Sequence, residues 1–121
     1  MSRLVIDEFA EKLVKCVRDH SIESFDAVRV ENKNSPTTRA FLANCGDNLE
    51  NVIDNIVPLV VDSTIFHFLS SVDNGDINIM YKSDAGEMIN LGISGMAELG
   101  GHYLDDDKDG WKAKFSQLRA T

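Results

Sequence analysis

The chain has 121 residues, of which 43% are hydrophobic and 26% are charged, and its formal net charge is −8. This length fits one globular domain, residues 1–121, and the composition, without low-complexity tract or repeat, argues against disordered and solenoid proteins. The sequence has neither the apolar core of a signal peptide nor an uninterrupted apolar run of about 18 residues, so we expect a cytoplasmic protein.

The negative charge is concentrated in one region of the chain. Residues 1–45 carry as many basic as acidic side chains, residues 46–109 carry thirteen acidic and two basic ones, and residues 110–121 are basic. A region of this sign repels phosphate backbones and anionic lipid, which argues against nucleic-acid and membrane binding. It favours either simple solubility or a basic protein partner.

The first part of the chain predicts three helices. Apolar residues recur at helical spacing from Leu4 to Val17, and Ser21 is a suitable N-cap for a second, short helix that fades in residues 31–34. Ser35 and Pro36 predict the start of a third helix, which should end near Gly46.

The most regular helical pattern follows. Asp47 and Glu50 have the spacing of a capping box, and apolar residues recur at i, i+3, i+4, i+7 and i+8 from Leu49 to Val57. Pro58 is expected to kink or end this helix, after which an apolar face continues over residues 61–72.

Residues 76–91 alternate between apolar and polar side chains on both sides of a short loop, which predicts a β-hairpin. Four glycines in residues 92–101 argue against a regular element there, and a last helix should present Trp111, Phe115 and Leu118 on one side. The predicted fold class is therefore α+β, with N-terminal helices packed against a small antiparallel β-hairpin and a C-terminal helix.

Trp111 is the only tryptophan in the chain. Because two strands alone are not stable, we expect its ring to be buried across the hairpin side chains Ile77, Ile79 and Leu91. The alternative is that the ring is an exposed anchor for a partner, since tryptophan is enriched in binding hot spots.

A possible metal site begins at Asp105, where Asp105, Asp107, Asp109 and Gly110 match the opening of a calcium loop. The bidentate Glu that closes such a loop is replaced by Ser116, and three lysines add positive charge to the region. The alternative is that Asp107 or Asp109 caps the last helix and interacts with its positive end. We favour the cap, and we expect neither a metal nor a cofactor.

No catalytic set is recognisable. The three histidines lie far apart in the sequence and do not assemble into a catalytic set, and the glycine-rich stretch lacks the spacing of a phosphate-binding loop. Cys16 and Cys45 lack the spacing of a zinc site, so we interpret both as reduced packing residues. We therefore expect no enzymatic activity.

The acidic side chains are the best candidates for a binding surface. Asp47, Glu50 and Asp54 should share one helix face, and most such faces are merely solvated. A cluster of like charges is, however, also what a protein that binds a basic surface presents. The candidate partner-binding residues are Asp47, Glu50, Asp54, Asp105, Asp106, Asp107 and Asp109.

The C-terminal third carries two short motifs, a turn after the hairpin and a G-W-x-x-K-F-S ending. Their residues are Ile93, Ser94, Glu98, Leu99, Gly110, Trp111, Lys114, Phe115 and Ser116. This region resembles small bacterial immunity-type proteins, which neutralise secreted polymorphic toxins. In that group a D-G pair often stands where this chain has Gly95 and Met96. The resemblance implies a protein without catalysis or cofactor that occludes a toxin's active site or a neighbouring surface.

The resemblance agrees with the distribution of charge. A toxin that cuts nucleic acid must carry a basic cleft, which an acidic partner reaches quickly and blocks without chemistry. The sequence therefore predicts an immunity protein whose acidic surface binds a basic toxin domain. Two alternatives stay open, namely a calcium-binding or enzymatic domain that uses Asp105–Asp109, and a structural adaptor domain.

Overall fold

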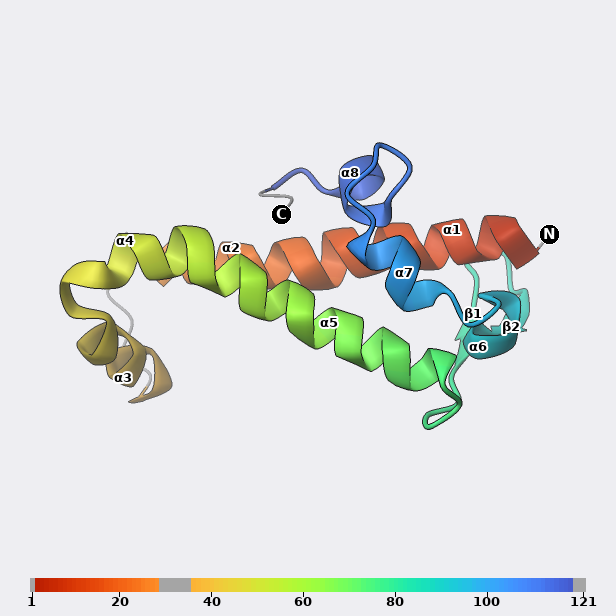
Figure 1. Cartoon of the computed structure of the whole chain (residues 1–121), viewed down its shortest axis with the longest axis horizontal. Helices are drawn as coiled ribbons and strands as arrows, with labels where there is room; N and C mark the ends of the chain where they lie inside the picture. Colours follow the sequence, from red (N-terminus) through yellow and green to blue (C-terminus); the bar gives the residue numbers. More distant parts are fainter. Residues whose placement is uncertain (1, 29–35, 119–121) are drawn as a thin grey trace.

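Two long helical rods dominate the computed structural model, which describes residues 2–28 and 36–118 (Figure 1). The first rod is unbroken and consists of α1 (Ser2–Lys12), the π-helical segment η1 (Leu13–Asp19) and α2 (His20–Val28). The second consists of α4 (Leu49–Asn51), the π-helical segment η3 (Val52–Ile56) and α5 (Val57–Asp73). The rods pack against each other where α5 meets η1 and α2.

The helix α3 (Pro36–Cys45) and the 3-10 turn η2 (Gly46–Asn48) precede the second rod and lie at one end of the molecule (Figure 1). Pro36 is the first helical residue, as predicted, whereas Ser35 and the expected fading of the second helix lie outside the described residues. Gly46 has a φ of 52°, a left-handed conformation that glycine adopts without strain and that reverses the chain between α3 and the rod.

Two predicted helix starts are wrong. Ser21 lies inside the first rod, where its hydroxyl donates to the carbonyl oxygen of Val17 at 2.6 Å instead of capping a new helix. Asp47 lies in η2, and the N-cap of α4 is Asn48, which makes no side-chain cap hydrogen bond. The capping box predicted for Asp47 and Glu50 is therefore not formed.

The helix does not end at Pro58, although the hydrogen bonding changes just before it. Proline has no backbone N–H to donate, so the regular α-helical pattern cannot pass through it. The preceding turn is π-helical, and the N–H of Val57 donates to the carbonyl oxygen of Val52, five residues earlier. A widened turn of this kind accommodates the N–H that Pro58 lacks without ending the helix, and the rod continues to Asp73.

The predicted hairpin is confirmed. Strands β1 (Met80–Lys82) and β2 (Met88–Asn90) pair antiparallel, with Tyr81 opposite Ile89. Three short helices follow, α6 (Leu91–Ser94), α7 (Leu99–Leu104) and α8 (Trp111–Phe115). The fold class is α+β, as the sequence predicted.

The short helices α6 and α7 occupy the glycine-rich stretch in which no regular element was expected. Each begins at a carboxamide or carboxylate that satisfies its first backbone donors. The side chain of Asn90 accepts from the N–H of Ile93 at 3.1 Å, and Asp73 at the end of α5 accepts from Leu99 and Gly100 at 3.0 and 2.9 Å. These polar contacts replace the helix propensity that the glycines lack.

The core lies between the first rod, α5 and the C-terminal helices. Its most completely buried members include Ala10, Val14, Leu69, Leu91, Leu99 and Tyr103. Trp111 is 4% exposed, so its predicted burial is confirmed. Its ring, however, packs edge-to-face on Phe9 at 6.2 Å and stacks on His102 at 5.9 Å, while Ile77 is exposed.

The hairpin is covered by α1. The ring of Tyr81 packs edge-to-face on Phe9 at 5.5 Å, and its hydroxyl donates to the carboxylate of Glu8. Lys12 reaches Asp84 in the hairpin loop at 2.6 Å. Because one face of the two strands packs on a helix in this way, the small sheet does not have to be stable alone.

Candidate functional site

A network of buried polar side chains joins the two rods. Arg18 on η1 is 0% exposed and Asp62 on α5 is 4% exposed. Arg18 donates from Nε to Oδ1 of Asp62 at 2.7 Å and from Nη2 to Oδ2 at 3.4 Å. A guanidinium that binds both oxygens of a carboxylate fixes the orientation of the two elements as well as their separation.

The same network fastens the residues that follow α8. Nη1 of Arg18 donates to Oδ1 of Asp19 at 3.1 Å and to Oγ of Ser116 at 2.9 Å. The Ser116 hydroxyl donates to Asp19 at 2.8 Å, and the backbone N–H of Gln117 donates to the other carboxylate oxygen at 3.0 Å. The last described residues are therefore bonded to the first rod.

The π-helical geometry of η1 places two adjacent charged residues on the same interior side. Successive side chains of an α-helix diverge by about 100°, and the wider π turn brings them closer in direction. Arg18 and Asp19 are both buried, at 0% and 4% exposure. π turns are frequent at functional sites, and this one places Arg18 and Asp19 in the buried polar network. We call this network, which consists of Arg18, Asp19, Asp62, Tyr103, Lys112 and Ser116, the Arg18 network.

Tyr103 and Lys112 complete the surroundings of Asp62. The Tyr103 hydroxyl donates to Oδ1 of Asp62 at 2.5 Å, and the Lys112 ammonium lies 3.6 Å from Oδ2 and 5.4 Å from the centre of the Tyr103 ring. Burial raises the pKa of Tyr103, and the bond to Asp62 raises it further. Burial alone would lower the pKa of Arg18, but Asp62 outweighs this effect and raises it.

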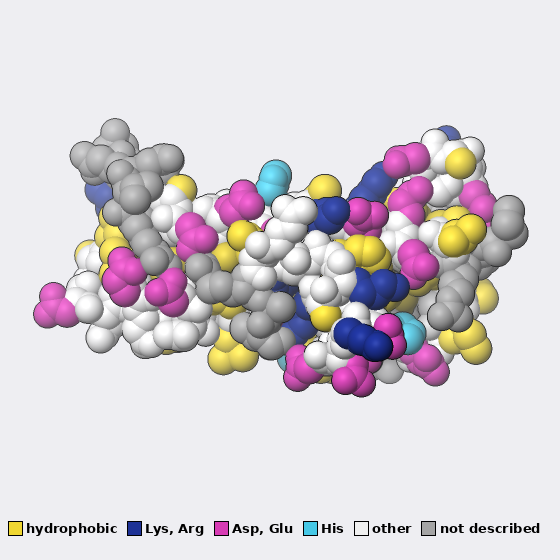
Figure 2. Space-filling model, turned by 90° about the horizontal axis from the view of Figure 1, so that it is seen from above, with side chains coloured by type: hydrophobic (Ala, Val, Ile, Leu, Met, Phe, Trp, Pro, Cys, Tyr) yellow, Lys and Arg dark blue, Asp and Glu magenta, His cyan; other side chains and the backbone are white. Residues whose placement is uncertain are grey.

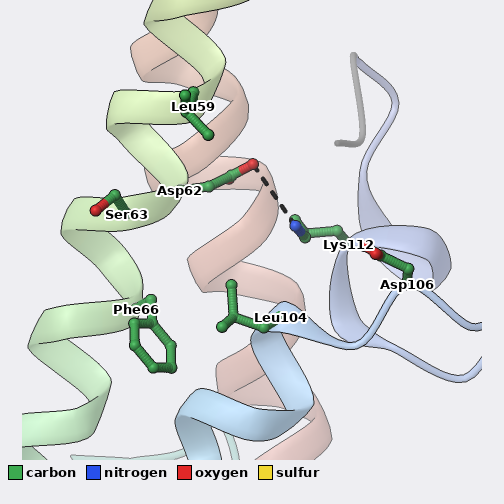
Figure 3. Close-up of a pocket in the computed structure, with 7 residues that line it drawn as sticks. All are labelled: Leu59, Asp62, Ser63, Phe66, Leu104, Asp106 and Lys112. Carbon is green, nitrogen blue, oxygen red and sulfur yellow. Dashed lines mark ion pairs between the residues drawn. The ribbon is translucent and has the colours of Figure 1, made fainter.

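A pocket of about 490 Å³ opens to solvent beside this network (Figure 3). The ion pair of Asp62 and Lys112 forms part of its wall, and the lysine side chain extends toward the aspartate (Figure 3). The remaining walls come from the outer side of α5, the end of α7 and the loop that follows it. The lining residues are Leu59, Asp62, Ser63, Phe66, Leu104, Asp106 and Lys112.

The outer face of η3 and α5 is apolar as well. Ile56, Leu59 and Val60 are 43%, 62% and 56% exposed, and their spacing of i, i+3 and i+4 places them on one side of the helix. We call these three residues the outer stripe. Leu59 belongs to both the stripe and the pocket, so the two form one continuous apolar surface.

An apolar outer stripe opposite an apolar core face makes this part of the chain unusually hydrophobic. Within the described residues, the helical run Arg39–Asp73 is long and apolar enough to cross a membrane by length and composition, with 33% of its most apolar window buried. This criterion averages hydropathy over 18 residues and therefore differs from the uninterrupted apolar run, which the sequence lacks. A core helix meets the same criterion, and this one packs on the first rod.

The structure separates the predicted acidic residues into two groups. Asp47 and Glu50 are exposed and Asp54 is half-buried, near the end of the molecule where α4 lies (Figure 1). Glu50 and Asp54 each take part in an interaction within the protein. The loop Asp105–Asp109 lies elsewhere, between α7 and α8 (Figure 1). Figure 2 likewise shows acidic side chains in several separate groups on one face.

The loop Asp105–Asp109 is exposed and tightly folded. Oδ1 of Asp105 accepts from the N–H of Asp107 at 2.9 Å, and the N–H of Gly110 donates to the carbonyl oxygen of Asp107 at 2.9 Å. The N-cap of α8 is Gly110, which has no side chain to cap with, so the predicted capping by Asp107 or Asp109 is wrong. The carboxylate of Asp105 instead stabilises the turn of its own loop.

The calcium alternative gains no support from this geometry. Among residues 2–28 and 36–118, no three acidic, histidine or cysteine side chains are grouped as a metal ion would require. Cys45 is buried as predicted, whereas Cys16 is exposed, which corrects its interpretation as a packing residue. His67 is exposed, and its Nδ1 lies 2.7 Å from the carbonyl oxygen of Ser63 on the same helix.

Sequence reasoning missed both the Arg18 network and the pocket. A signal for the network exists, because Asp62 lies three and seven residues before Ile65 and Leu69, in phase with the buried face of α5. A charged residue in phase with an apolar stripe indicates a buried pair, since carboxylates are almost never fully buried alone. The pocket has no comparable signal, because its walls come from three separate segments.

Comparison with known proteins adds no information about this site. No protein-family model matches the chain, and neither the curated proteins nor the solved structures yielded a significant match.

Proposed function

We propose that the chain is a non-enzymatic binding protein that neutralises a basic toxin domain by occluding it, as an immunity protein does. One observation carries the proposal, namely that the exposed acidic loop Asp105–Asp109 adjoins an apolar pocket and the outer stripe of α5. Protein interfaces combine an apolar centre with a polar rim, and this surface offers both.

The disposition of the acidic residues supports the proposal. Asp62 and Asp73 are engaged within the protein, with Arg18 and with the backbone of α7. The carboxylates of the loop Asp105–Asp109, by contrast, face solvent. An exposed group of like charges steers a basic partner and speeds its association.

The rigidity of the surface supports it as well. The pocket walls belong to α5, α7, α8 and the loop between the last two. The bonds of Asp62 to Arg18, Tyr103 and Lys112 connect the three helices to the first rod. A surface that is already in its bound form loses little conformational entropy on association. Such preorganisation suits a protein that acts by binding alone.

The test begins with a partner, and the first candidate is a secreted protein with a basic C-terminal domain encoded by the neighbouring reading frame. We expect this domain to bind the chain, and co-expression to protect cells against it. Replacing Asp105, Asp106 and Asp107 together by Lys should slow association about tenfold or more and reduce its dependence on salt.

The second group of acidic residues provides the comparison. Asp47→Lys combined with Glu50→Lys changes the charge by four units at the α4 end of the molecule, against six units for the loop variant. The effect per unit of charge is expected to be smaller there. The proposal is wrong if the basic domain does not bind, or if the variant with the reversed loop protects as well as the parent.

A further inference from the structure

We infer that the pocket and the outer stripe bind one amphipathic helix of the partner, whose apolar side chains enter the pocket while a lysine or arginine pairs with Asp106. The inference rests on the proposed function, because it takes the partner to be basic. It adds the form of the bound segment and the residues that receive it.

The size and composition of the pocket suit side chains from one helical turn. Its volume of about 490 Å³ lies within the range of sites that enclose whole ligands, about 300–1,000 Å³. Leu59, Phe66 and Leu104 provide apolar walls. Residues at i and i+4 of a helix lie about 5–6 Å apart, so two apolar side chains can enter together.

The neighbouring surface favours a helix over an extended strand. A bound strand gains its affinity from backbone hydrogen bonds to a sheet edge, and this face is built from helices whose backbone groups are already bonded. The outer stripe offers instead a row at i, i+3 and i+4, formed by Ile56, Leu59 and Val60. A second helix packs on such a row by placing its ridges in the grooves between the side chains.

The rim of the pocket sets the charge of the bound helix. Asp106 lines the pocket, and the other carboxylates of the loop Asp105–Asp109 are exposed beside it. The one cation in the wall, Lys112, is 4% exposed and directed toward Asp62 (Figure 3). Lys108 in the same loop is exposed too, so four carboxylates and one ammonium leave the loop a net charge of −3, which selects lysine or arginine on the incoming helix.

The same charges disfavour two other occupants. A second copy of the chain, packed through the same face in a two-fold dimer, would add an identical acidic loop to the interface. A membrane surface rich in anionic lipid would repel the loop. Both occupants are nevertheless distinct outcomes of the experiment below.

The probe is an amidated helical peptide of about 16 residues, built from alanine and lysine with leucines at i, i+4 and i+7. Binding is followed by the anisotropy of a fluorescent label and by the amide signals of Leu59, Ser63 and Leu104 in nitrogen-15 NMR spectra. We expect saturable binding that shifts these signals. A peptide with glutamate for lysine, and one with serine for leucine, should each bind at least about tenfold more weakly.

Variants of exposed residues test the location without unfolding the protein. Leu59→Asp and Leu104→Asp should each weaken peptide binding about tenfold or more, since these side chains are 62% and 43% exposed and line the pocket. Asp106→Lys should weaken it several-fold, most strongly at low salt. Leu4→Asp, at a residue 71% exposed outside this surface, is the matched control and should change nothing.

Each remaining outcome removes the inference in a defined way. Equal binding of the glutamate peptide, or an undiminished affinity of Leu59→Asp, excludes a basic helix in this pocket. Dimers that Leu59→Asp makes monomeric assign the surface to a second copy, and binding to neutral lipid vesicles without peptide binding assigns it to a membrane. If the peptide does not bind but the basic domain does, the inference is wrong and the proposed function stands. If the peptide binds but the basic domain does not, the proposed toxin partner is wrong.

Discussion

Arg18 joins three parts of the chain in the interior of the protein. Its guanidinium group is fully buried and contacts Asp62, Asp19 and Ser116, which belong to three different parts of the chain. The charges in the network are balanced, because Arg18 and Lys112 face two carboxylates. Removing one member therefore leaves a buried charge without compensation.

The first prediction follows from this balance. Arg18→Ala should lower the free energy of unfolding by about 3–5 kcal/mol, because the two buried carboxylates of Asp19 and Asp62 lose the guanidinium that they share. Urea unfolding measures the change. Lys15→Ala is the control, since Lys15 makes an exposed pair with Glu11 on the same helix and should cost less than about 1 kcal/mol. Equal stabilities of the two variants would show that water enters the network.

The second prediction concerns alkaline pH and Tyr103. Burial and Asp62 raise the pKa of Tyr103 above its ordinary value of 10.0, so the unfolded chain releases this proton before the folded protein does. Stability is therefore complete below pH 10 and falls as the pH rises further. Urea midpoints measured from pH 8 upward should decline beyond about pH 10.

Tyr103→Phe is the variant that separates this residue from Tyr81, whose pKa is also raised, by burial and by Glu8. The variant should be less stable by about 1–2 kcal/mol at neutral pH, through loss of the bond to Asp62. Its alkaline decline should be shallower than that of the parent. A decline as steep as before would assign the effect to other groups.

At the scale of elements, the loop between α7 and α8 depends on one glycine. A Cβ atom at Gly110 would lie 2.0 Å from the backbone oxygen of Asp105, whereas one at Gly101, in the middle of α7, would meet nothing within 4 Å. Gly110→Ala should therefore destabilise the protein by several kcal/mol, because backbone must move. Gly101→Ala should stabilise it by about 0.5–1 kcal/mol, since alanine favours a helix. Thermal unfolding distinguishes the opposite signs.

The short helix α8 is anchored by Trp111. Truncation to alanine removes the contacts with Phe9 and His102 and leaves a cavity, so Trp111→Ala should cost about 3–5 kcal/mol of stability. Phe68→Ala, at a ring 40% exposed on α5, is the control and should cost much less. A Trp111→Ala protein that melts like the parent would contradict the packing described above.

The long helices, the last helix and the hairpin could be predicted from sequence because their signals are local, whereas α6 and α7, in the glycine-rich stretch, could not. Period 3.6 marks the rods, and the alternation around Tyr81 and Ile89 marks the strands. The π turns could not be predicted in this way. Their hydrogen bonding depends on what the turn must accommodate, which is a buried pair for Arg18 and a missing donor for Pro58.

The candidate site could be predicted only in part, for a related reason. The exposure of Asp105–Asp109 follows from local composition, and the structure places these residues in a solvent-facing loop. The pocket beside them joins Leu59, Leu104 and Lys112, which are far apart in sequence. Local sequence patterns do not predict that these residues lie close together, because their proximity depends on how the rods cross.

At the scale of the whole molecule, stability should be unevenly distributed. The helix α3 lies at one end of the protein, and its described side chains are exposed or half-buried except for Cys45, whereas α5 packs on both the first rod and α7 (Figure 1). Hydrogen exchange should therefore be markedly faster at the amides of α3 than at those of α5 around Ile65 and Leu69. Equal protection of the two helices would show that they unfold as one unit.

The contacts of Ser116 and Gln117 with Asp19 also set an order of events during synthesis. The bonded residues are separated by 97 and 98 positions, so η1 leaves the ribosome long before its last partners exist. At a translation rate of about 5–20 residues per second, the delay is on the order of 5–20 s. During this interval Asp19 lacks these two partners, and the pocket lacks the wall that Lys112 provides. The surface that we propose for partner binding is therefore complete only late in synthesis, after Lys112 has emerged.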